Sequence, residues 1–318
     1  MDLSIIIVNW NSKEYLRKCL GSILAETREL EFEIIVVDSA SFDGCEEMLR
    51  KEFPQVRFIQ SRENLGFAKS NNLAFQSARS EFVLFLNPDT EIVGSAINEL
   101  HAAFKKLADA GAVGGRLVNT DETVQTSCIQ AFPTILNQVL SAEWLRRRFP
   151  KSRLWGMAPL YETSTSPQLV EAISGACVML PRWLLEKVGV FSEDYFMYAE
   201  DIDLSLKVSQ AGYKCYYVPN ATVVHHGGGS SQQAGSNLTS MHMQESAWRF
   251  FRKTRGRFYG LVYRASMLVS ALVRLTLLVV LFPAGMIWRH RTAWRASFQK
   301  WKAILFWSVQ RPKWGNDL

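Results

Sequence analysis

The stretch Leu3–Ser12, with the sequence LSIIIVNWNS, is an unbroken run of mostly β-branched residues that ends in polar ones. Three further runs have the same character, namely Glu33–Val37 (EIIVV), Val56–Ile59 and Phe82–Leu86 (FVLFL). An apolar run without polar alternation is typical of a strand buried on both faces, as in a parallel sheet. We therefore predict that these segments are parallel strands of one sheet.

Segments of helical periodicity separate these strands. Lys13–Ala25, Asp43–Phe53 and Phe67–Ala78 each follow one strand, and helix Ala96–Ala108 and strand Gly111–Leu117 continue the alternation. A regular strand–helix order predicts an α/β fold in which a mostly parallel, doubly wound sheet is flanked by helices.

The rest of the chain suggests two parts. Residues 119–168 contain four of the chain's prolines and lack a clear period, after which strand character returns at Ala172–Leu180. From Met241 the chain is helical, amphipathic and basic. We predict a main domain over residues 1–240, with an insertion at 119–168, and a helical tail over 241–318.

Polar residues follow three of the predicted strands directly. Asn9 ends the first, Asp38 ends the second, and Asn87-Pro88-Asp89 follows the fourth. Such residues also serve as helix caps and turn formers, but three in succession at the same end of a parallel sheet indicate a ligand site. No GxGxxG or GxxxxGK[ST] motif is present, which argues against a nicotinamide-dependent oxidoreductase and a P-loop enzyme.

Five sequence motifs together resemble those of the family 2 inverting glycosyltransferases, and most closely a rhamnosyltransferase-like branch. They occur in the family's order as VNWNS (8–12), VVDSASFDG (36–44), ENLGFAKSNN (63–72), LNPDT (86–90) and MYAEDIDLSLKVSQAGY (197–213). The resemblance implies a GT-A fold and a nucleoside-diphosphate-sugar donor such as dTDP-rhamnose or a UDP-sugar. We expect the irregular insertion at 119–168 to shape the acceptor side.

Besides Asp89 of the LNPDT motif, five residues are assigned to donor binding. Asp38 matches the acid that accepts a hydrogen bond from the ring nitrogen of a pyrimidine base, and Asn9 and Asn64 match nucleoside contacts. Gly66 allows a close approach of the backbone because it lacks a Cβ. Asn71 lies one helical turn after Phe67 and is expected to line the same cleft.

A divalent cation, Mg²⁺ or Mn²⁺, is also implied. Asn87-Pro88-Asp89 matches the family's DxD motif with Asn in the first position, so Asp89 is the expected donor-side metal ligand. His225 matches a late histidine that completes the metal site. His226 is the alternative ligand, since neighbouring residues in a strand face opposite ways.

The motif Glu200-Asp201-Ile202-Asp203 matches the acidic segment that supplies the catalytic base. We assign the base to Asp201, which would take the proton from the acceptor hydroxyl. Glu200 and Asp203 are expected to support the helix or contact the acceptor, and Gly175 to let the acceptor pass close to the backbone. A bland alternative is that these acids only favour a helix N-terminus.

The tail differs from the main domain in charge. From Ser246 onward there are 14 basic residues and one acid, which gives +13 against a total of +6. The tail also contains long apolar runs, and Trp294, Phe298, Trp301 and Leu305 recur at helical spacing. These features favour an anionic membrane surface over nucleic acid as the partner. Interfacial or re-entrant helices, a true span and a protein–protein surface are the alternatives for the tail.

These observations predict an enzyme that moves a sugar to a glycan or lipid-linked acceptor during polysaccharide synthesis. We expect it on the cytoplasmic face of the membrane, as a peripheral or monotopic protein. Five scattered cysteines without CxxC spacing are interpreted as reduced and buried. The competing hypothesis is a catalytically inactive nucleotide-sugar-binding scaffold, against which the intact Asp38, Asp89 and Asp201 argue.

Overall fold

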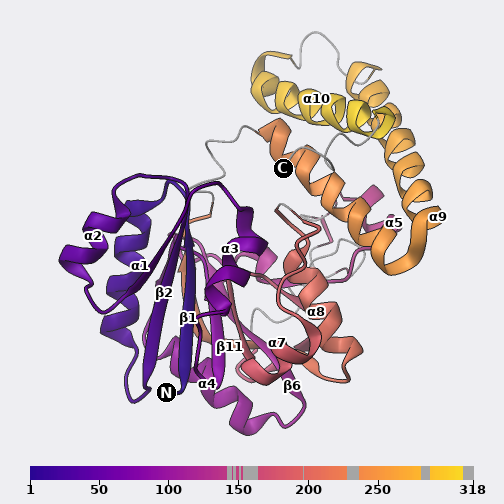
Figure 1. Ribbon diagram of the computed structural model, residues 1–318. Helices are drawn as coiled ribbons and strands as arrows, with labels where there is room; N and C mark the ends of the chain where they lie inside the picture. Colours follow the sequence, from indigo (N-terminus) through magenta and orange to yellow (C-terminus); the bar gives the residue numbers. More distant parts are fainter. Residues whose placement is uncertain are drawn as a thin grey trace. The chain divides into compact units, whose positions relative to one another are not determined.

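The computed structural model of the protein describes residues 1–141, 145, 148–149, 152, 164–195, 197–227, 236–280 and 287–310 (Figure 1). The chain forms two compact units. Unit 1 comprises Met1–Phe132 and Ser141–Ser230, and unit 2 comprises Pro133–Leu140 and Ser231–Leu318.

The four apolar runs predicted as strands form the parallel half of the main sheet in unit 1. They are β1 (Leu3–Asn9), β2 (Phe32–Ser39), β3 (Arg57–Ser61) and β4 (Phe82–Leu86), in the order β3-β2-β1-β4. The strands are apolar on both sides because helices cover both faces, so Ile5 and Ile7 pack in one layer and Ile6 in the other. This confirms the prediction of a mostly parallel sheet.

The second half of the sheet is mixed. β10 (Cys177–Pro181) runs antiparallel between β4 and β6 (Ala110–Val118), and β11 (Lys214–His225) lies parallel to β6. Two short strands, β5 (Thr90–Ile92) and β8 (Gln168–Val170), pair antiparallel with β11.

The predicted strand Ala172–Leu180 is wrong as a single element. Its first residues form β9 (Ala172–Ile173), which pairs with β7 (Ile129–Gln130) in a separate two-stranded sheet. The strand β7 follows directly after the short 3-10 helix η1 (Thr126–Cys128). The last residues of the predicted strand form β10. A turn at Ser174–Ala176 separates the two strands, and it places Gly175 beside Asp201.

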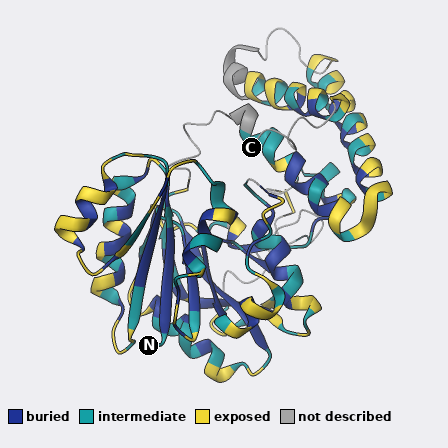
Figure 2. Ribbon diagram, in the orientation of Figure 1, coloured by how far each residue is buried: buried dark blue, intermediate teal, exposed yellow. Residues whose placement is uncertain are grey.

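In the part of unit 1 that the structure describes, helices cover both faces of the sheet (Figure 2). On one face lie α1 (Lys13–Glu26), α2 (Cys45–Glu52) and α4 (Ala96–Lys106). On the other lie α3 (Gly66–Phe75), α7 (Arg182–Val188) and α8 (Glu200–Gln210). The carboxyl ends of the parallel strands thus meet at a single edge that both helix layers border.

Unit 2 is helical, with α5 (Ile135–Val139), α9 (Ser236–Val280) and α10 (Ile287–Val309). α9 bends at Gly256, whose φ of 88° and ψ of 170° are not helical. Its core includes Phe251 and Tyr263, whose ring centroids lie 4.7 Å apart.

The predicted apolar stripe of α10 packs partly within unit 2 rather than lying free for a membrane. Trp301 is buried, with the Arg274 guanidinium of α9 lying 4.3 Å from its ring centroid. The Trp294 indole N–H donates to the carbonyl of Leu278 at 3.1 Å. A neighbouring apolar helix covers such a stripe as well as lipid does.

Much of the expected insertion at 119–168 lies outside the described residues. Of its described parts, Pro133–Leu140 groups with unit 2, whereas the segment before it packs in unit 1. The expected division at residues 240 and 241 falls inside α9, which begins at Ser236. The roles given to these parts stay predictions.

Candidate active site

The strand register brings the predicted polar residues to one edge of the sheet. Asn9 lies opposite Asp38 in the parallel pair β1–β2, and Ile7 lies opposite Leu86, so that Asn87 leaves the sheet beside the same strand ends. Asn87 N–H donates to the Ala176 carbonyl at 2.9 Å, which joins this edge to the turn that carries Gly175.

Asp38 is a fully buried carboxylate held by several donors. The Gln60 amide donates to it at 2.8 Å, the Asn9 amide at 2.7 Å and Ser41 N–H at 3.1 Å, and the Ser41 hydroxyl donates to it as well. Burial opposes its ionisation, but the hydrogen bonds outweigh burial and hold the pKa of Asp38 below its ordinary value. An ionised acceptor at a strand end suits a ring N–H of a nucleobase.

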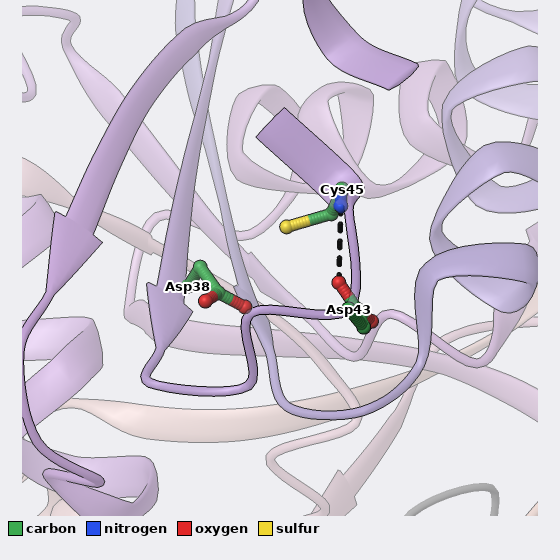
Figure 3. A group of neighbouring side chains, drawn as sticks. All are labelled: Asp38, Asp43 and Cys45. Carbon is green, nitrogen blue, oxygen red and sulfur yellow. Dashed lines mark hydrogen bonds between the residues drawn. The ribbon is translucent and has the colours of Figure 1, made fainter. Parts of the chain in front are cut away.

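Asp43 and Cys45 lie beside Asp38, with one potential ligand atom from each of the three within 4.8 Å of the others (Figure 3). Asp43 accepts from Lys13 N–H and Cys45 N–H, both at 3.0 Å, and so ties the loop to two helices. Burial raises the pKa of the Cys45 thiol. Because a thiol binds metal as its thiolate, this trio suits hydrogen bonding better than metal binding.

The other predicted donor-binding residues form hydrogen bonds within the loops around Asp38. Asn9 is fully buried and bridges Asp38 and Asp43 through its amide, and its Oδ1 has no hydrogen-bond partner among the described residues. Asn64 Oδ1 accepts from Gly66 N–H at 2.9 Å and from the Ser39 hydroxyl at 3.2 Å. Gly66 starts α3 with φ of 71°, a left-handed conformation that favours glycine.

Asn71 is buried in α3. Its amide donates to the carbonyl of Phe67 at 2.9 Å, one helical turn earlier. Donor binding by Asn9, Asn64, Gly66 and Asn71 stays a prediction. The structure shows how they build the loops around Asp38.

Asp89 and His225 meet at the end of β11. The distance from Asp89 Oδ1 to His225 Nε2 is 3.4 Å, and Asn87 Nδ2 also lies 3.4 Å from that nitrogen. His226 faces the other way, with its Nε2 at 2.6 Å from Glu91 Oε1 and its ring against Tyr15. A carboxylate oxygen and an imidazole nitrogen that converge in this way fit a Mg²⁺ or Mn²⁺ ion, with His225 rather than His226 as the histidine.

Asp201 lies at the N-terminus of α8 with both carboxylate oxygens engaged. Oδ2 accepts from Gly175 N–H at 3.0 Å and from the Gln130 amide at 3.2 Å, and Oδ1 accepts from Ile202 N–H at 2.8 Å. Burial outweighs these hydrogen bonds and raises the pKa of Asp201. Gly175 leaves little room, because a Cβ there would lie 3.4 Å from Asp201 Cβ and 3.3 Å from the Phe67 ring.

The two flanking acids have different environments. Glu200 is buried with Oε2 unpaired among the described residues, and burial raises its pKa to about 8. Asp203 is also buried, but it accepts from the hydroxyls of Ser192 and Tyr195 and lies 3.7 Å from Lys207 Nζ. These contacts tie α8 to the segment that carries Ser192 and Tyr195. They suit the helix-supporting role that is one of the two expected for Asp203.

The turn before α8 is held in an uncommon conformation. Tyr198 and Ala199 have φ of 70° and 65°, in the left-handed region that non-glycine residues rarely adopt. Such strain concentrates at functional sites, where the surrounding structure imposes it. Here it directs the first residues of α8 toward the Gly175 turn.

Four residues of the site were absent from the sequence-based assignment. Gln60 and Asp43 hold the Asp38 loop, Gln130 contacts Asp201, and Gln125 contacts His225. Asp43 stands inside the VVDSASFDG motif, so the sequence contained a signal for it. The glutamines lie in no motif, and only the fold brings them to the site.

Family comparisons cover nearly the whole chain. The profile described as Glycosyl transferase family 2 matches residues 4–166, and that described as Glycosyl transferase family group 2 matches residues 122–309. The first match alone spans just over half of the chain.

Two similar proteins are rhamnosyltransferases. The N-acetylglucosaminyl-diphospho-decaprenol L-rhamnosyltransferase of Mycobacterium tuberculosis is 28% identical over 256 residues, which cover 76% of this chain and 81% of the relative. The rhamnosyltransferase WbbL of Escherichia coli is 24% identical over 264 residues, covering 79% and 93%.

The fold is that of solved GT-A-like enzymes. The mannosyltransferase PcManGT from Pyrobaculum calidifontis, solved in complex with GDP-Man and Mn²⁺, superposes with a TM-score of 0.59 at 18% identity, over 96% of this chain and 86% of that one. GalNAc-T7, solved with UDP, GalNAc and Mn²⁺, gives a TM-score of 0.55 at 17% identity, over 70% and 43%.

The motifs, the GT-A-like sheet and the profile matches agree, and the chain belongs to glycosyltransferase family 2, in its rhamnosyltransferase-like branch.

Proposed function

We propose that this glycosyltransferase moves a sugar, with inversion, from a nucleoside-diphosphate sugar to a hydroxyl of a lipid-linked glycan. The observation that carries the proposal is the gathering of three acids, Asp38, Asp89 and Asp201, along one edge of the sheet and the turn beside it. The matched relatives, which are named for rhamnosyl transfer, make dTDP-rhamnose the first donor to test.

In the proposed reaction Asp201 acts as the general base. Its carboxylate takes the proton from the acceptor hydroxyl, while that oxygen forms a bond to the anomeric carbon and the bond to the nucleoside diphosphate breaks. Burial favours this role, since a raised pKa makes the carboxylate a stronger base. The hydrogen bonds from Gly175 and Ile202 hold this carboxylate in one orientation, which supports the role.

The donor would lie with its base at Asp38 and its diphosphate at Asp89. The carboxylate of Asp38 would accept the ring N–H of uracil or thymine, which distinguishes these bases from cytosine. Asp89 and His225 would hold Mg²⁺ or Mn²⁺, and a bound cation stabilises the charge that develops on the leaving diphosphate. Asn87 contributes no charge to this site.

The relatives and the tail support a lipid-linked acceptor. The M. tuberculosis relative is named for an N-acetylglucosaminyl-diphospho-decaprenol acceptor, so we propose an N-acetylglucosaminyl-diphospho-polyprenol for this chain. A polyprenol lies in the membrane, and an enzyme that uses it benefits from binding there.

We propose that one face of α9 binds the membrane. Its exposed apolar side chains from Phe258 onward, here called the α9 apolar stripe, are Phe258, Leu261, Val262, Val269, Leu272, Val273, Leu277, Val279 and Val280. Among the described residues, Thr239–Val280 is the helix whose length and composition would allow it to cross a membrane, with a window of mean hydropathy 1.6 of which 22% is buried. Exposed Arg252, Lys253, Arg255 and Arg257 precede the stripe and suit an anionic leaflet.

The two arginines between Phe258 and Val280 do not interrupt the stripe. The Arg264 guanidinium donates to the carbonyls of Trp307 at 2.7 Å and Ser308 at 3.1 Å. The Arg274 guanidinium donates to the carbonyl of Val139 at 2.7 Å and lies over Trp301, so it is paired within unit 2. The stripe therefore presents only uncharged side chains between Phe258 and Val280. We place this surface on the cytoplasmic leaflet, where nucleotide sugars are available.

A donor screen tests the proposal. Full-length protein in anionic vesicles with N-acetylglucosaminyl-diphospho-polyprenol is incubated with dTDP-rhamnose, UDP-sugars and GDP-mannose, with Mn²⁺ or with excess chelator. We expect release of nucleoside diphosphate from one thymidine or uridine donor, only with the cation, and a product whose anomeric configuration is inverted in its proton NMR spectrum. Retention of configuration, or equal turnover in chelator, would contradict the mechanism.

A further inference from the structure

The side chain of Gln125 is joined to His225 at two points. Gln125 Oε1 lies 2.8 Å from His225 Nδ1, and the Gln125 amide donates to the carbonyl oxygen of His225 at 2.6 Å. The same amide donates to Asn119 Oδ1 at 2.8 Å. The two residues are 100 positions apart in the chain, so the contact exists only in the folded protein.

A chain of hydrogen bonds runs from Asp121 at the surface through Thr123, Asn119 and Gln125 to His225. The carboxylate of Asp121 determines which group donates in each of these bonds. The Thr123 hydroxyl donates to Asp121 Oδ1 at 2.5 Å, and hydrogen bonds from Thr123 hold the pKa of Asp121 below its ordinary value. An ionised carboxylate can only accept, so the Thr123 oxygen accepts from the Asn119 amide at 2.8 Å. Asn119 must then turn its Oδ1 toward Gln125.

Gln125 is left with a single orientation. Its amide faces two oxygens that cannot donate, the Asn119 Oδ1 and the His225 carbonyl. Its Oε1 therefore faces the His225 ring, and an oxygen that only accepts requires a proton on Nδ1. In the neutral imidazole, Nε2 then carries the lone pair.

We infer that Gln125 is a positioning residue that holds His225 as the Nδ1–H tautomer and directs the Nε2 lone pair toward Asp89. Nε2 lies 3.4 Å from Asp89 Oδ1, so two acceptor atoms from different elements converge there. A hydrogen bond to the second ring nitrogen orients a metal-binding histidine and makes it a better ligand. The inference rests on the proposed metal role of His225.

Backbone hydrogen bonds and strand pairing connect the turn of Gln125 to the strand of His225. Gln125 N–H donates to the Leu117 carbonyl at 2.8 Å, and Val118 and Val124 form an isolated bridge, which closes the turn between them. Val118 also pairs with Val224, the residue before His225. The turn that carries Gln125 and the strand that carries His225 are thus joined by backbone as well as side-chain contacts.

The first test measures the tautomer without metal or substrate. In full-length protein labelled with ¹⁵N-histidine, with the His225 signal identified by its loss in His225→Gln, we expect the Nδ1–H form in wild type. Gln125→Leu removes the acceptor and should shift His225 toward the Nε2–H form. Gln125→Glu keeps an oxygen for Nδ1–H and should preserve the tautomer, whereas Gln55→Ala, in an exposed loop, is the matched control.

The second test measures Mn²⁺ binding by electron paramagnetic resonance in the presence of dTDP or UDP. We expect Gln125→Leu to weaken Mn²⁺ binding by roughly 10–100-fold, the range for outer partners of metal ligands. Thr123→Val, at the exposed end of the network, should weaken it less and guards against misfolding of the leucine variant. Unchanged Mn²⁺ affinity or an unchanged tautomer in Gln125→Leu would overturn the inference.

The two hypotheses fail in different ways. If wild-type protein with dTDP or UDP binds no Mn²⁺, the metal role of His225 in the proposed function is wrong, and the inference about a metal ligand is wrong with it. If wild type binds Mn²⁺ but His225 is already the Nε2–H form, only the role of Gln125 is wrong.

Discussion

Asp201, Glu200 and Asp203 belong to one short motif, yet their surroundings separate their roles. Asp201 is held by backbone donors beside the Gly175 turn, Glu200 is buried with one oxygen unpaired among the described residues, and Asp203 receives two hydroxyls. A base must be held in one orientation, whereas an anchor must have its hydrogen bonds satisfied. We therefore propose Asp201 as the base and Asp203 as the anchor of α8.

We expect Asp201→Asn to lower the rate of transfer by about 10²–10⁴-fold, because the amide cannot accept the acceptor's proton. Donor binding should persist, since the base acts on the acceptor. Single-turnover kinetics and calorimetric titration with nucleoside diphosphate separate the two effects. Asp203→Asn is the matched control and should chiefly lower thermal stability. Loss of turnover in a folded Asp203→Asn, with normal turnover in Asp201→Asn, would reverse the assignment.

Glu200 should make stability depend on pH. Burial raises its pKa to about 8 from an ordinary value of 4.5. Between these values the folded chain keeps a proton that the unfolded chain releases, so the free energy of unfolding falls as pH rises, by up to about 1.4 kcal/mol per pH unit. Its stabilising effect is complete at lower pH and is lost as pH passes the folded pKa.

Glu200→Gln should remove this dependence, because the amide stays neutral. Urea unfolding of wild type and variant, measured between about pH 5 and about pH 8, gives the difference in free energy of unfolding. We expect the variant to gain relative to wild type as pH rises. A constant difference across this range would show that Glu200 does not titrate as its burial indicates.

Asp38→Ala should raise the KM for donor by about 10–100-fold, the loss expected for a hydrogen bond to a charged group, with a smaller change in kcat. The bond to the base is present in both the ground state and the transition state. Asp109→Ala is a suitable control, since Asp109 is an exposed acid that pairs with Lys214 before β6 begins. An unchanged donor KM would remove Asp38 from the nucleotide site.

At the scale of elements, the pairing of β6 with β11 determines which histidine faces Asp89. The register shifts between Val218 and Thr222, where Val218 lies opposite Gly115 and Thr222 opposite Arg116. Three residues of β11 are thus inserted, and an odd insertion reverses the face to which later side chains point. His225 therefore faces Asp89, while His226 faces Glu91.

Gly115 makes room for this bulge. A Cβ at Gly115 would lie 2.6 Å from the Ala221 carbonyl oxygen, a backbone atom that cannot rotate away. We expect Gly115→Ala to destabilise the fold by about 1–3 kcal/mol through overpacking. Gly21→Ala in α1 is the opposite case, with no atom within 4 Å of the added Cβ, and should stabilise by about 0.5–1 kcal/mol. Thermal unfolding of both variants decides, and equal effects would contradict this account.

At the scale of the whole molecule, the two units differ in what they expose. Unit 1 covers both faces of its sheet with helices, whereas unit 2 leaves the α9 apolar stripe uncovered by any described residue. Deleting the tail from Gly260 onward would not test this surface cleanly. It would separate Tyr263 from Phe251, which pack at 4.7 Å in the core of unit 2.

Substitutions on the stripe test it in the intact chain. We expect the triple variant Leu261→Glu/Val269→Glu/Val273→Glu to lose co-flotation with anionic liposomes, while nucleotide binding persists. The exchange removes apolar surface that would enter the lipid, and the added carboxylates are repelled by the anionic leaflet. Leu169→Glu, on an exposed position of β8, is the control. High salt should loosen wild-type binding only in part, since it screens only the charges. Flotation of the triple variant equal to wild type would exclude this face.

The sequence by itself determined the parallel strands and the edge where Asp38 and Asp89 lie. An unbroken apolar run reports burial on both faces, and parallel strands end on the same side. Neither deduction needs a distant contact. Motif order was also enough to indicate the family, because each motif is continuous in the chain.

Only the tertiary structure decided which distant groups meet. Gln125 reaches His225, Gln130 reaches Asp201, Ser192 and Tyr195 hold Asp203, and Trp301 packs on Arg274. The periodicity of a sequence indicates that one face of a helix will be covered. It does not indicate which distant segment covers that face. The covering partner depends on loop closure and packing among segments far apart in sequence, and those are properties of the folded chain.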